Sequence, residues 1–562
     1  MRILTRNEVQ EAEREATGRT GMSALVLMQR AGSAVAQFCV SHFKFSSVCV
    51  VCGRSKSSGY GMAAAEALRE LAATVSVIIL AGEATELTDD TAAMCSRLSA
   101  EPIFVADEAG LDDNAVRDAL GADLIVDAIA GGDFAPLLEG LARKAVEAVN
   151  DAFGTVVSVD LPSGIDPDSK APAHESGVDA VFAHGIITFI APKPAHVFGE
   201  LTSGPIAVSE IGVQPALAAH STGLSVITGQ EVGITFPPRL SDAHKGDFGH
   251  VLVIAGSRGK AGVAALAGMA ALRAGAGLVT VACPKSIQAT VAGFAPELMT
   301  EGLAETPDGT IAMDAAGQLE SLTTGKDVIV LGSGLSRNPE TAGFVRHLVA
   351  RCSLPLVLDG DGLNAFEGHY HELKRGSEAA PFRVLILHPG EAARLFGVAT
   401  DDVHADSLEV ARRLARETGC CVVLKGRRTV VAGASTETWV NMTGNSALAK
   451  GGADEVLAGI AGAALTRRSG SLLRVGDVAG AREPDSGADL AAEQHANPGQ
   501  ASAFLKDVKV AAAVYLHGLA ADFARDMLHE NTVLASDLLD TLTEAFRDGD
   551  LQMDQRLFYL QK

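Results

Sequence analysis

The stretch HVLVIAGS at residues 250–257 decides the fold class of the second half of this 562-residue chain. It holds five consecutive apolar residues, 251–255, and then reaches Gly256. Such an unbroken run is typical of a parallel strand with helices on both faces, whereas a half-exposed strand would alternate apolar with polar residues. We therefore predict a buried parallel strand that ends at a glycine turn.

The same pattern recurs along the second half of the chain. Further strand-like runs are GLVTVACP (277–284), DVIVLGSG (327–334), LPLVLDGDGLN (354–364), RVLILHPGE (383–391) and CVVLKGRRTVVAG (421–433). Apolar residues at helical spacing indicate helices at 261–275, 456–468 and 507–528. Strands that alternate with helices in this way predict an α/β domain with a mostly parallel sheet.

A separate α/β series occupies the first half. Two helices over residues 1–36 and a helix at 61–73 accompany strand-like runs at 46–53, 74–82, 122–131, 154–164 and 185–192. We predict one domain over 1–215 and a second over 222–562. Residues 469–504 have little periodicity and many polar residues, so we predict a mobile surface insertion there.

Composition narrows the class of protein. The net charge of -23 and the lack of a Lys/Arg-rich run argue against nucleic acid as a partner. No apolar stretch reaches the length of about 18 residues that a membrane span needs, so we expect no membrane association. A charged N-terminus without a signal-peptide core and eight cysteines without a regular framework favour the cytoplasm. We interpret Cys49 and Cys52 as the interior of a strand.

Glycine-rich segments in the second half form the candidate site, because ligands of open α/β sheets bind outside the carboxyl ends of the strands. The segments are GSRGKAGVA (256–264), GSGLS (332–336), HPGEAARL (388–395) and TGNSALAKGGADEVLAG (443–459). A glycine after a strand is usually only a turn. The order and spacing of all four segments together, and not any one glycine, indicate a ligand-binding site.

The segments, taken in this order, resemble the ADP- or ATP-dependent NAD(P)H-hydrate dehydratases. Four further motifs contribute to the resemblance: HKGDFG (244–249), LDGDGLN (358–364), LKGRRTVV (424–431) and YLHGLAAD (515–522). The resemblance spans about residues 240–540. It implies a ribokinase-like fold and the use of ADP or ATP with Mg²⁺. The implied reaction phosphorylates the hydroxyl of hydrated NADH or NADPH and then eliminates phosphate.

The resemblance also implies roles for single residues. Glu455 is the implied catalytic base. The implied substrate-binding residues are Val263, Gly334 and His388, and the implied nucleotide-binding residues are Lys425, Gly426, Thr429, Gly451, Gly452 and Asp454. Asp359, Asp361 and Asn364 form a polar cluster that either orients metal-bound water or phosphate, or caps a helix.

Two positions of the last segment depart from the family. Glu455 stands where the family has its catalytic Asp, and Asp454 stands where the family has a Gly. Asp454 adds a like charge beside the nucleotide phosphates. The possibility of a weakened or inactive dehydratase therefore stays open. A second possibility is that the loop is shifted by one residue relative to the family, which would make Asp454 the base.

The first half resembles the NAD(P)H-hydrate epimerases over about residues 5–212. The motifs are LMQRAG (27–32), VCGRSKSSGYG (51–61), LIVDAIAGG (124–132), VSVDLPSGID (157–166) and APKPA (191–195). The resemblance implies a Rossmann-like three-layer α/β/α domain with bound potassium. It assigns potassium to Ser57, Asp127 and Ser163, substrate binding to Gly131, and proton transfer during inversion at C6 to Asp160.

The loop KSSGYG (56–61) departs from the family's NNGGDG. Ser57 replaces a potassium-ligating Asn, and Lys56 and Tyr60 replace an Asn and an Asp. Two interpretations therefore stay open. The domain is an active epimerase, or it keeps the fold but has lost the epimerase site.

The leading hypothesis is a bifunctional, homo-oligomeric enzyme that repairs hydrated NADH and NADPH. A ribokinase-like kinase of a small molecule is an alternative, against which the segments around 245, 388 and 517 argue. A non-catalytic nucleotide-binding regulatory protein is another, which the altered loops at 56–61 and 453–455 favour.

Overall fold

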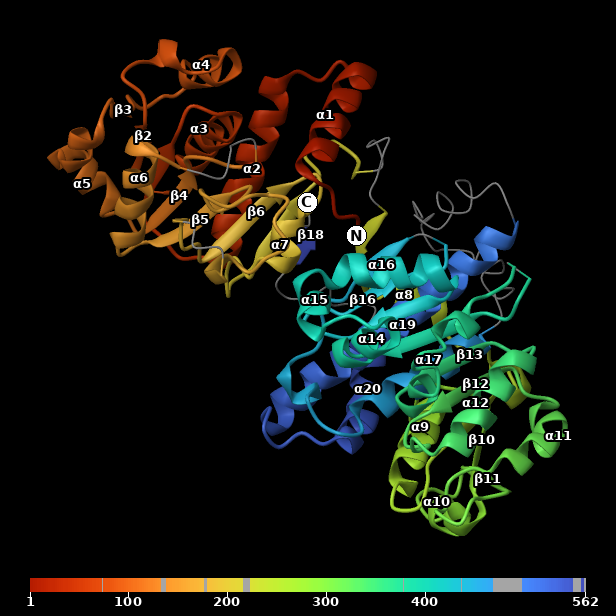
Figure 1. Ribbon diagram of the computed structural model, residues 1–562. Helices are drawn as coiled ribbons and strands as arrows, with labels where there is room; N and C mark the ends of the chain where they lie inside the picture. Colours follow the sequence, from red (N-terminus) through yellow and green to blue (C-terminus); the bar gives the residue numbers. More distant parts are fainter. Residues whose placement is uncertain are drawn as a thin grey trace. The chain divides into compact units, whose positions relative to one another are not determined.

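The chain folds into two compact units. The computed structural model describes residues 1–72, 74–132, 138–175, 179–215, 223–377, 379–435, 437–467, 498–548 and 557–559. The first unit is Met1–Leu224 with Met553–Lys562, and the second is Ser225–Gln552 (Figure 1). Most of the expected insertion, 469–497, lies outside the described residues, and residues 498–504 begin helix α19. No helix among the described residues is both long and apolar enough to cross a membrane.

The first unit has an eight-stranded sheet in the order β18-β7-β6-β5-β4-β1-β2-β3, in which every pair is parallel. The strands are β1 (Ser47–Cys52), β2 (Thr74–Ile79), β3 (Ile103–Phe104), β4 (Leu124–Ala128), β5 (Thr155–Val159), β6 (Gly185–Phe189), β7 (Ile206–Ser209) and β18 (Leu557–Tyr559). The helices are α1 (Arg6–Thr20), α2 (Ala24–His42), α3 (Lys56–Leu68), α4 (Asp89–Cys95), α5 (Asn114–Leu120), α6 (Gly140–Asp151) and α7 (Pro194–Phe198).

Successive residues of β1 face opposite layers of this unit. Val50 and Cys52 belong to the hydrophobic cluster of α1–α4, whereas Cys49 and Val51 belong to the cluster of α5 and α6. Both cysteines are fully buried in the strand, which confirms the prediction of a strand interior.

The second unit has a ten-stranded sheet in the order β11-β10-β9-β12-β13-β14-β15-β16-β17-β8. Its strands are β8 (Leu224–Val226), β9 (His250–Ala255), β10 (Leu278–Pro284), β11 (Met299–Leu303), β12 (Val328–Gly332), β13 (Leu356–Asp359), β14 (Arg383–Leu387), β15 (Cys421–Leu424), β16 (Val430–Ala432) and β17 (Thr438–Val440). Pairing is parallel from β11 to β15 and antiparallel from β15 to β17. The α/β class predicted for both halves is confirmed.

Helices cover both faces of this second sheet. They are α8 (Gly229–Thr235), α9 (Ala261–Arg273), α10 (Gln288–Ala292), α11 (Leu319–Thr323), α12 (Pro339–Arg351), α13 (Asp361–Asn364), α14 (Pro389–Phe396), α15 (Thr400–Ala405), α16 (Ser407–Thr418), α17 (Ala453–Thr466), α19 (Pro498–Leu528) and α20 (Ala535–Asp548). Helices α9, α17, α19 and α20 share one hydrophobic cluster with alternate residues of the strands.

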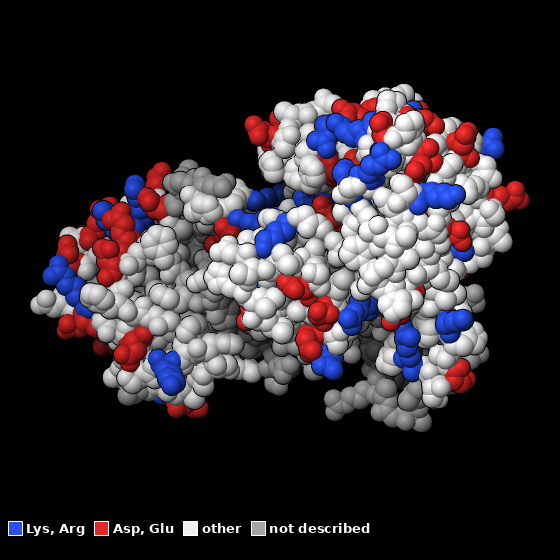
Figure 2. Space-filling view, turned by 90° about the horizontal axis from the view of Figure 1, so that it is seen from below, with Lys and Arg blue, Asp and Glu red and all other residues white. Residues whose placement is uncertain are grey.

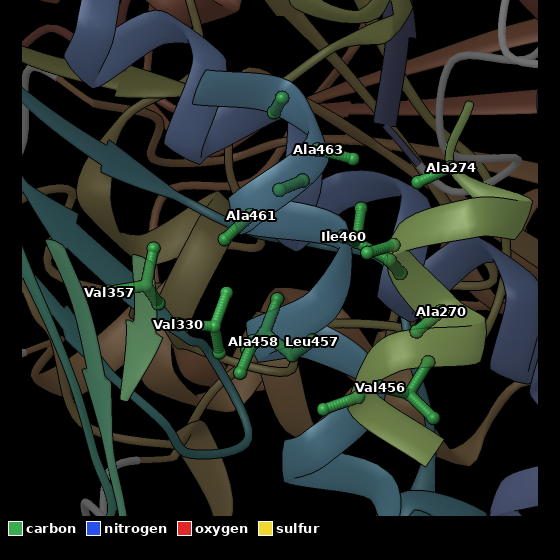
Figure 3. Packing of buried hydrophobic residues seen from close by; sticks show 14 of the residues in the cluster. Ala270, Ala274, Val330, Val357, Val456, Leu457, Ala458, Ile460, Ala461 and Ala463 are labelled. Atoms are coloured by element: carbon green, nitrogen blue, oxygen red, sulfur yellow. The ribbon is translucent and has the colours of Figure 1, made fainter. Parts of the chain in front are cut away.

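Helix α17 lies unusually close to its neighbours in that cluster. Figure 3 shows its residues Val456 and Ile460 near Ala270 of α9, and Ala458 near Val330 of β12. A Cβ atom on Gly459 would lie 2.2 Å from the backbone oxygen of Ala267 in α9. The backbones of α17 and α9 can approach this closely only because no side chain stands between them.

We therefore expect Gly459→Ala to lower the free energy of unfolding of the second unit by about 1–3 kcal/mol, the range seen for overpacked cores. Gly343→Ala is the matched control, since Gly343 lies inside helix α12 and a Cβ there would meet nothing within 4 Å. That control should raise the free energy of unfolding by about 0.5–1 kcal/mol, because alanine is the better helix former. Urea denaturation measures both, and equal changes would contradict the packing argument.

Candidate active sites

The site of the second unit begins with an ion pair. Lys425 follows β15 directly, and its Nζ lies 2.5 Å from Oδ2 of Asp454 in the first turn of α17. The Lys425 side chain is only 16% exposed, whereas that of Asp454 is 47% exposed. Burial alone would lower the pKa of Lys425, but the carboxylates of Asp454 and Asp359 outweigh burial and raise it. Lys425 is therefore a fixed positive charge at the start of α17.

Two more carboxyl groups belong to the same electrostatic cluster. Asp359 at the end of β13 is buried and accepts a hydrogen bond of 2.7 Å from Ser333 Oγ. Burial raises its pKa to about 7, although Lys425 opposes that rise. Glu455 is half-buried, and burial and then the charge of Asp454 raise its pKa. The cluster thus holds one lysine against three carboxyl groups, two of which hold a proton more readily than usual.

The first turn of α17 is arranged to receive an anion. Gly452, just before the helix, has a φ of 100°, and no side chain caps the helix. A Cβ on Gly451 would meet nothing within 4 Å, so the approach to the backbone there is open. The start of this 14-residue helix is the positive end of its dipole, which attracts negative groups. The predicted residues Gly451, Gly452 and Lys425 therefore lie together around the start of α17.

Helix α19 holds this arrangement in place through two residues that sequence reasoning did not single out. His517 Nε2 lies 2.9 Å from the backbone oxygen of Ala453. Burial lowers the pKa of His517 to about 4, so the ring is neutral near pH 7 and donates to that oxygen. Asp522 accepts hydrogen bonds of 2.8 Å from Gly444 N and Asn445 Nδ2. Both residues belong to YLHGLAAD (515–522), which was the available signal.

The predicted substrate-binding residues are partly assembled. A Cβ on Gly334, whose φ is 75°, would lie 2.6 Å from Cγ2 of Val263, so these two residues are in contact. His388 caps α14 instead, where its Nδ1 accepts from Gly390 N at 3.0 Å. No contact joins His388 to Val263 or Gly334 among the described hydrogen bonds and ion pairs.

The remaining predicted residues of this half stabilise loops. Thr429 Oγ1 accepts from Gly426 N at 3.4 Å across the turn after β15. Asp361 accepts from Ser336 N at 2.8 Å and from Asn364 Nδ2 at 3.1 Å, which ties the loop after β12 to α13. These contacts show Asp361 holding the loop after β12 against α13, and no side chain caps that helix. No group of three or more His, Cys, Asp or Glu among the described residues could hold a metal ion by itself.

The site of the first unit centres on Asp160, which follows β5. Its Oδ1 accepts from Lys193 Nζ at 2.6 Å and from Thr188 Oγ1 at 2.8 Å, and its Oδ2 accepts from Gly132 N at 3.0 Å. Burial alone would raise the pKa of Asp160, but the charge of Lys193 outweighs it and the pKa is lowered. Asp160 and Lys193 are 7% and 3% exposed, so this is a buried pair of opposite charges.

Lys193 is the functional candidate that sequence reasoning missed, although it lies in the quoted motif APKPA (191–195). Its neighbour His196 has a pKa lowered to about 4 by burial, so the ring is neutral near pH 7. His196 Nε2 donates to the backbone oxygen of Asp160 at 2.7 Å. Asp160 has a φ of 71°, a strained conformation for a residue other than glycine, and this contact helps to hold it.

Asp127, a predicted potassium ligand, is fully occupied by hydrogen bonds. Oδ1 accepts from Ser163 Oγ at 2.5 Å and Ile129 N at 3.3 Å, and Oδ2 accepts from Ser158 Oγ at 2.8 Å and Ser163 N at 2.9 Å. A carboxylate has about four lone-pair sites, and all are used. The Ser163 hydroxyl also accepts from Ala130 N at 2.8 Å. The residues as arranged therefore do not fit a cation bound by Asp127.

Residues 56–61, which were predicted as a loop, form the first turns of α3 and are joined to α1 and to the Asp160 site. A Cβ on Gly131 would lie 2.1 Å from Ser57 Oγ and 3.4 Å from the Cβ of Asp160, so these three predicted residues converge. Lys56 Nζ pairs with Glu13 Oε2 at 2.5 Å, and Tyr60 OH donates to Glu13 Oε1 at 3.3 Å. Glu13 therefore balances the charge that Lys56 brings to these turns.

Neither lysine of the two sites belongs to the exposed charge of the molecule. Figure 2 shows basic and acidic side chains interspersed on the face in view. Exposed pairs such as Arg117 with Asp112, 2.7 Å apart, contribute little stability each. Lys193 is buried and Lys425 is mostly buried, so water screens the charges of these two lysines less than it screens the exposed pairs.

Comparison with known proteins places the two halves in two family models. Residues 251–544 match the model described as NAD(P)H-hydrate dehydratase, and residues 24–195 match that of the YjeF-related protein N-terminus. A bifunctional NAD(P)H-hydrate repair enzyme of Moorella thermoacetica is 32% identical over 564 residues, which cover 99% of this chain and 98% of that protein. Proteins of the same description from Thermofilum pendens and Escherichia coli are 34% and 31% identical, over 82% of this chain and 86% and 84% of theirs.

Among solved structures, an ADP/ATP-dependent NAD(P)H-hydrate dehydratase of Bacillus subtilis, co-crystallised with ATP and Mg²⁺, is similar at 26% identity. The match has a TM-score of 0.45 and covers 58% of this chain and 98% of that one.

The raised pKa of Asp359 predicts a pH-dependent cost to folding. Between its ordinary value of 3.8 and about 7, the unfolded chain releases the Asp359 proton while the folded chain keeps it. Stability therefore falls as the pH rises through this window. Asp359→Asn cannot ionise, so its unfolding temperature relative to the unaltered protein should be higher at pH 8 than at pH 5.

Thermal unfolding followed by circular dichroism at both pH values tests this expectation. The exposed carboxyl of Asp314 supplies the control, and Asp314→Asn should leave the difference between the two pH values unchanged. An equal effect of Asp359→Asn at pH 5 and pH 8 would show that Asp359 is ionised in the folded protein throughout.

Proposed function

The chain belongs to the family of bifunctional NAD(P)H-hydrate repair enzymes, and from this premise we propose that the second unit dehydrates hydrated NADH and NADPH at the start of α17, and that the first unit interconverts their two C6 epimers at Asp160. The observation that carries the proposal is the cluster of Lys425, Asp454 and Glu455 at an uncapped helix start. It offers a cation and a carboxyl base beside the positive end of a helix dipole.

For the dehydratase, we propose that the phosphates of ADP or ATP lie over Gly451 and Gly452 and that Lys425 neutralises them. The uncapped turn and the open space above Gly451 support this placement. Mg²⁺ would be held by the phosphates, by water and by at most one or two carboxylates, as is usual for nucleotide sites, and it supplies charge neutralisation.

Glu455 is the proposed base. The substrate hydroxyl oxygen forms its bond to the terminal phosphorus while its proton passes to Glu455, and the rest of the nucleotide leaves. The C–O bond then breaks as phosphate departs and the ring loses a proton, which regenerates NADH or NADPH. The raised pKa of Glu455 supports this role, because a base with a higher pKa accepts a proton more readily. Asp454 is less suited, since Lys425 already holds its carboxylate.

For the epimerase, we propose that the Asp160 carboxylate, oriented by Lys193, Thr188 and Gly132, moves the proton during inversion at C6. Its lowered pKa keeps the carboxylate ionised near pH 7, so it starts in the basic form, although it is a weaker base than an ordinary carboxylate. The occupied lone pairs of Asp127 leave no place for potassium in this proposal, and no step depends on it.

A second candidate function is nucleotide binding without turnover. One observation favours it, the ion pair of Lys425 with Asp454. The Asp454 carboxylate already binds the ammonium group that the nucleotide phosphates would otherwise bind. Incubation of hydrated NADPH with ADP or ATP, followed at 340 nm, distinguishes the candidates. Return of NADPH supports the dehydratase, whereas saturable nucleotide binding without return of NADPH supports the second candidate.

Variants at 454 and 455 identify the base. Glu455→Gln should reduce dehydration by about 10²-fold or more, the usual contribution of a general base. Glu455→Asp should keep or raise the rate, because Glu is one methylene longer than the family's Asp. Asp454→Gly should lower the KM for the nucleotide by removing a like charge.

Asp454→Asn should be tolerated and serves as the matched control one residue away. The assignment to Glu455 fails if Asp454→Asn abolishes turnover while Glu455→Gln is tolerated.

The altered residues at 56–61 predict that potassium has little effect on the rate of epimerisation. Epimerisation above the spontaneous rate should be the same in KCl and NaCl of equal ionic strength, and Asp160→Asn should remove it. The triple variant Lys56→Asn, Ser57→Asn and Tyr60→Asp should also stay unresponsive to potassium, because the hydrogen bonds that occupy Asp127 come from Ile129, Ser158 and Ser163. Exchange of the two epimers is followed by chromatography. Stimulation of the unaltered protein by potassium would contradict the lone-pair argument at Asp127.

A further inference from the structure

The last strand of the chain completes the sheet of the first unit. Strand β18 pairs in parallel with β7, with Leu557 opposite Ile206, Phe558 opposite Ala207 and Tyr559 opposite Val208. Leu557 is 2% exposed, so the strand buries an apolar side chain as well as forming the ladder. The first unit therefore contains residues from both ends of the chain, and the second unit is inserted between them.

Without β18, strand β7 would be an unprotected edge. Its sequence, IAVS, holds no charge and no proline, which are the usual protections of an edge strand. Ile206, Ala207 and Val208 are all buried. The opposite edge of the sheet is β3, which is only two residues long and so offers little ladder to pair with. Of the two edges, only that of β7 needs a cover, and β18 provides it.

The pairing leads directly towards the site of the first unit. Val208, which pairs with Tyr559, pairs on its other side with Thr188 of β6. Thr188 donates to Asp160 and accepts from Lys193. One strand, β7, therefore separates the C-terminal strand from a residue that touches both members of the buried ion pair.

We infer that Leu557–Tyr559 is an intramolecular clasp for the first unit, which keeps β7 and β6 in register and thereby positions Thr188 against Asp160 and Lys193. The occupant of the β7 edge is the C-terminus of the same chain. The first unit then reaches its complete form only after the whole second unit has been made, because β18 lies at the far end of the chain.

Hydrogen exchange of the full chain and of two truncated variants tests the clasp. Removal of residues 557–562 should speed exchange of the backbone amides of 206–209 by about tenfold or more, since their protection then depends on local opening. Removal of 560–562, which leaves β18 intact, is the matched control and should change nothing. Amides of β9 at 250–255 should keep their protection in both variants. Unchanged exchange at 206–209 after removal of 557–562 would overturn the inference.

Two further measurements cover the case in which the shorter chain does not fold. A protease site placed within 549–556 lets the intact protein fold before it is cut, and the clasp predicts that the freed tail stays bound in native mass spectrometry. Immediate loss of the tail would overturn the inference. An intact chain that is dimeric by light scattering, and monomeric once 557–562 is removed, would also overturn it, because β18 would then pair with a second copy.

The effect on activity rests on the epimerase proposed above. Removal of 557–562 should slow epimerisation at least about tenfold while dehydration by the second unit continues, as expected for a displaced positioning group. Faster exchange at 206–209 with unchanged epimerisation would overturn the link to Thr188 but leave the clasp. If the intact chain does not epimerise at all, the proposed function fails, and the exchange experiment still decides on the clasp.

Discussion

Helix α17 can begin at the strand ends of the second sheet only because it lies within backbone distance of its neighbours. Gly459 allows the contact with Ala267 of α9, and a Cβ on Gly462 would lie 2.6 Å from Cγ2 of Val330 in β12. Larger side chains at either position would push the helix away and move its first turn. The geometry of Lys425, Asp454 and Glu455 is therefore a consequence of small residues one and two turns further along the helix.

Both units use a lysine against a carboxylate, but burial gives the two pairs different consequences. Lys193 and Asp160 are nearly inaccessible, and each would be an uncompensated buried charge without the other. That pair is a permanent part of the fold, and a ligand has to bind beside it. Asp454 is half-exposed, so water can replace Lys425 at its carboxylate, and a phosphate can replace Asp454 at the lysine. The second pair is therefore open to exchange with an anionic ligand.

The long apolar runs were sufficient to predict the central strands, because a buried parallel strand needs apolar residues on both faces. Strands β3, β7, β8, β11, β17 and β18 were not predicted, since runs of two to five residues can acquire strand conformation from a partner strand rather than from their own sequence. Similarly, glycine motifs located Val263 and Gly334 next to each other, but Lys193 stands between two prolines in what resembles an ordinary loop. Its role depends on a contact with Asp160, 33 residues earlier, which only the fold supplies.

The unusual residues of the two altered segments, which the structure places in the first turns of α3 and α17, have partners on neighbouring elements. Lys56 and Tyr60 both bind Glu13 of α1, and Asp454 binds Lys425 after β15. A segment that had merely lost its function would place no constraint on a compensating charge elsewhere. Here each new charge lies beside an opposite one, at 2.5 Å in both cases. Because an unpaired charge near either site would cost more than these pairs contribute, the partners explain how the altered segments keep the local fold while the chemistry of each site is adjusted.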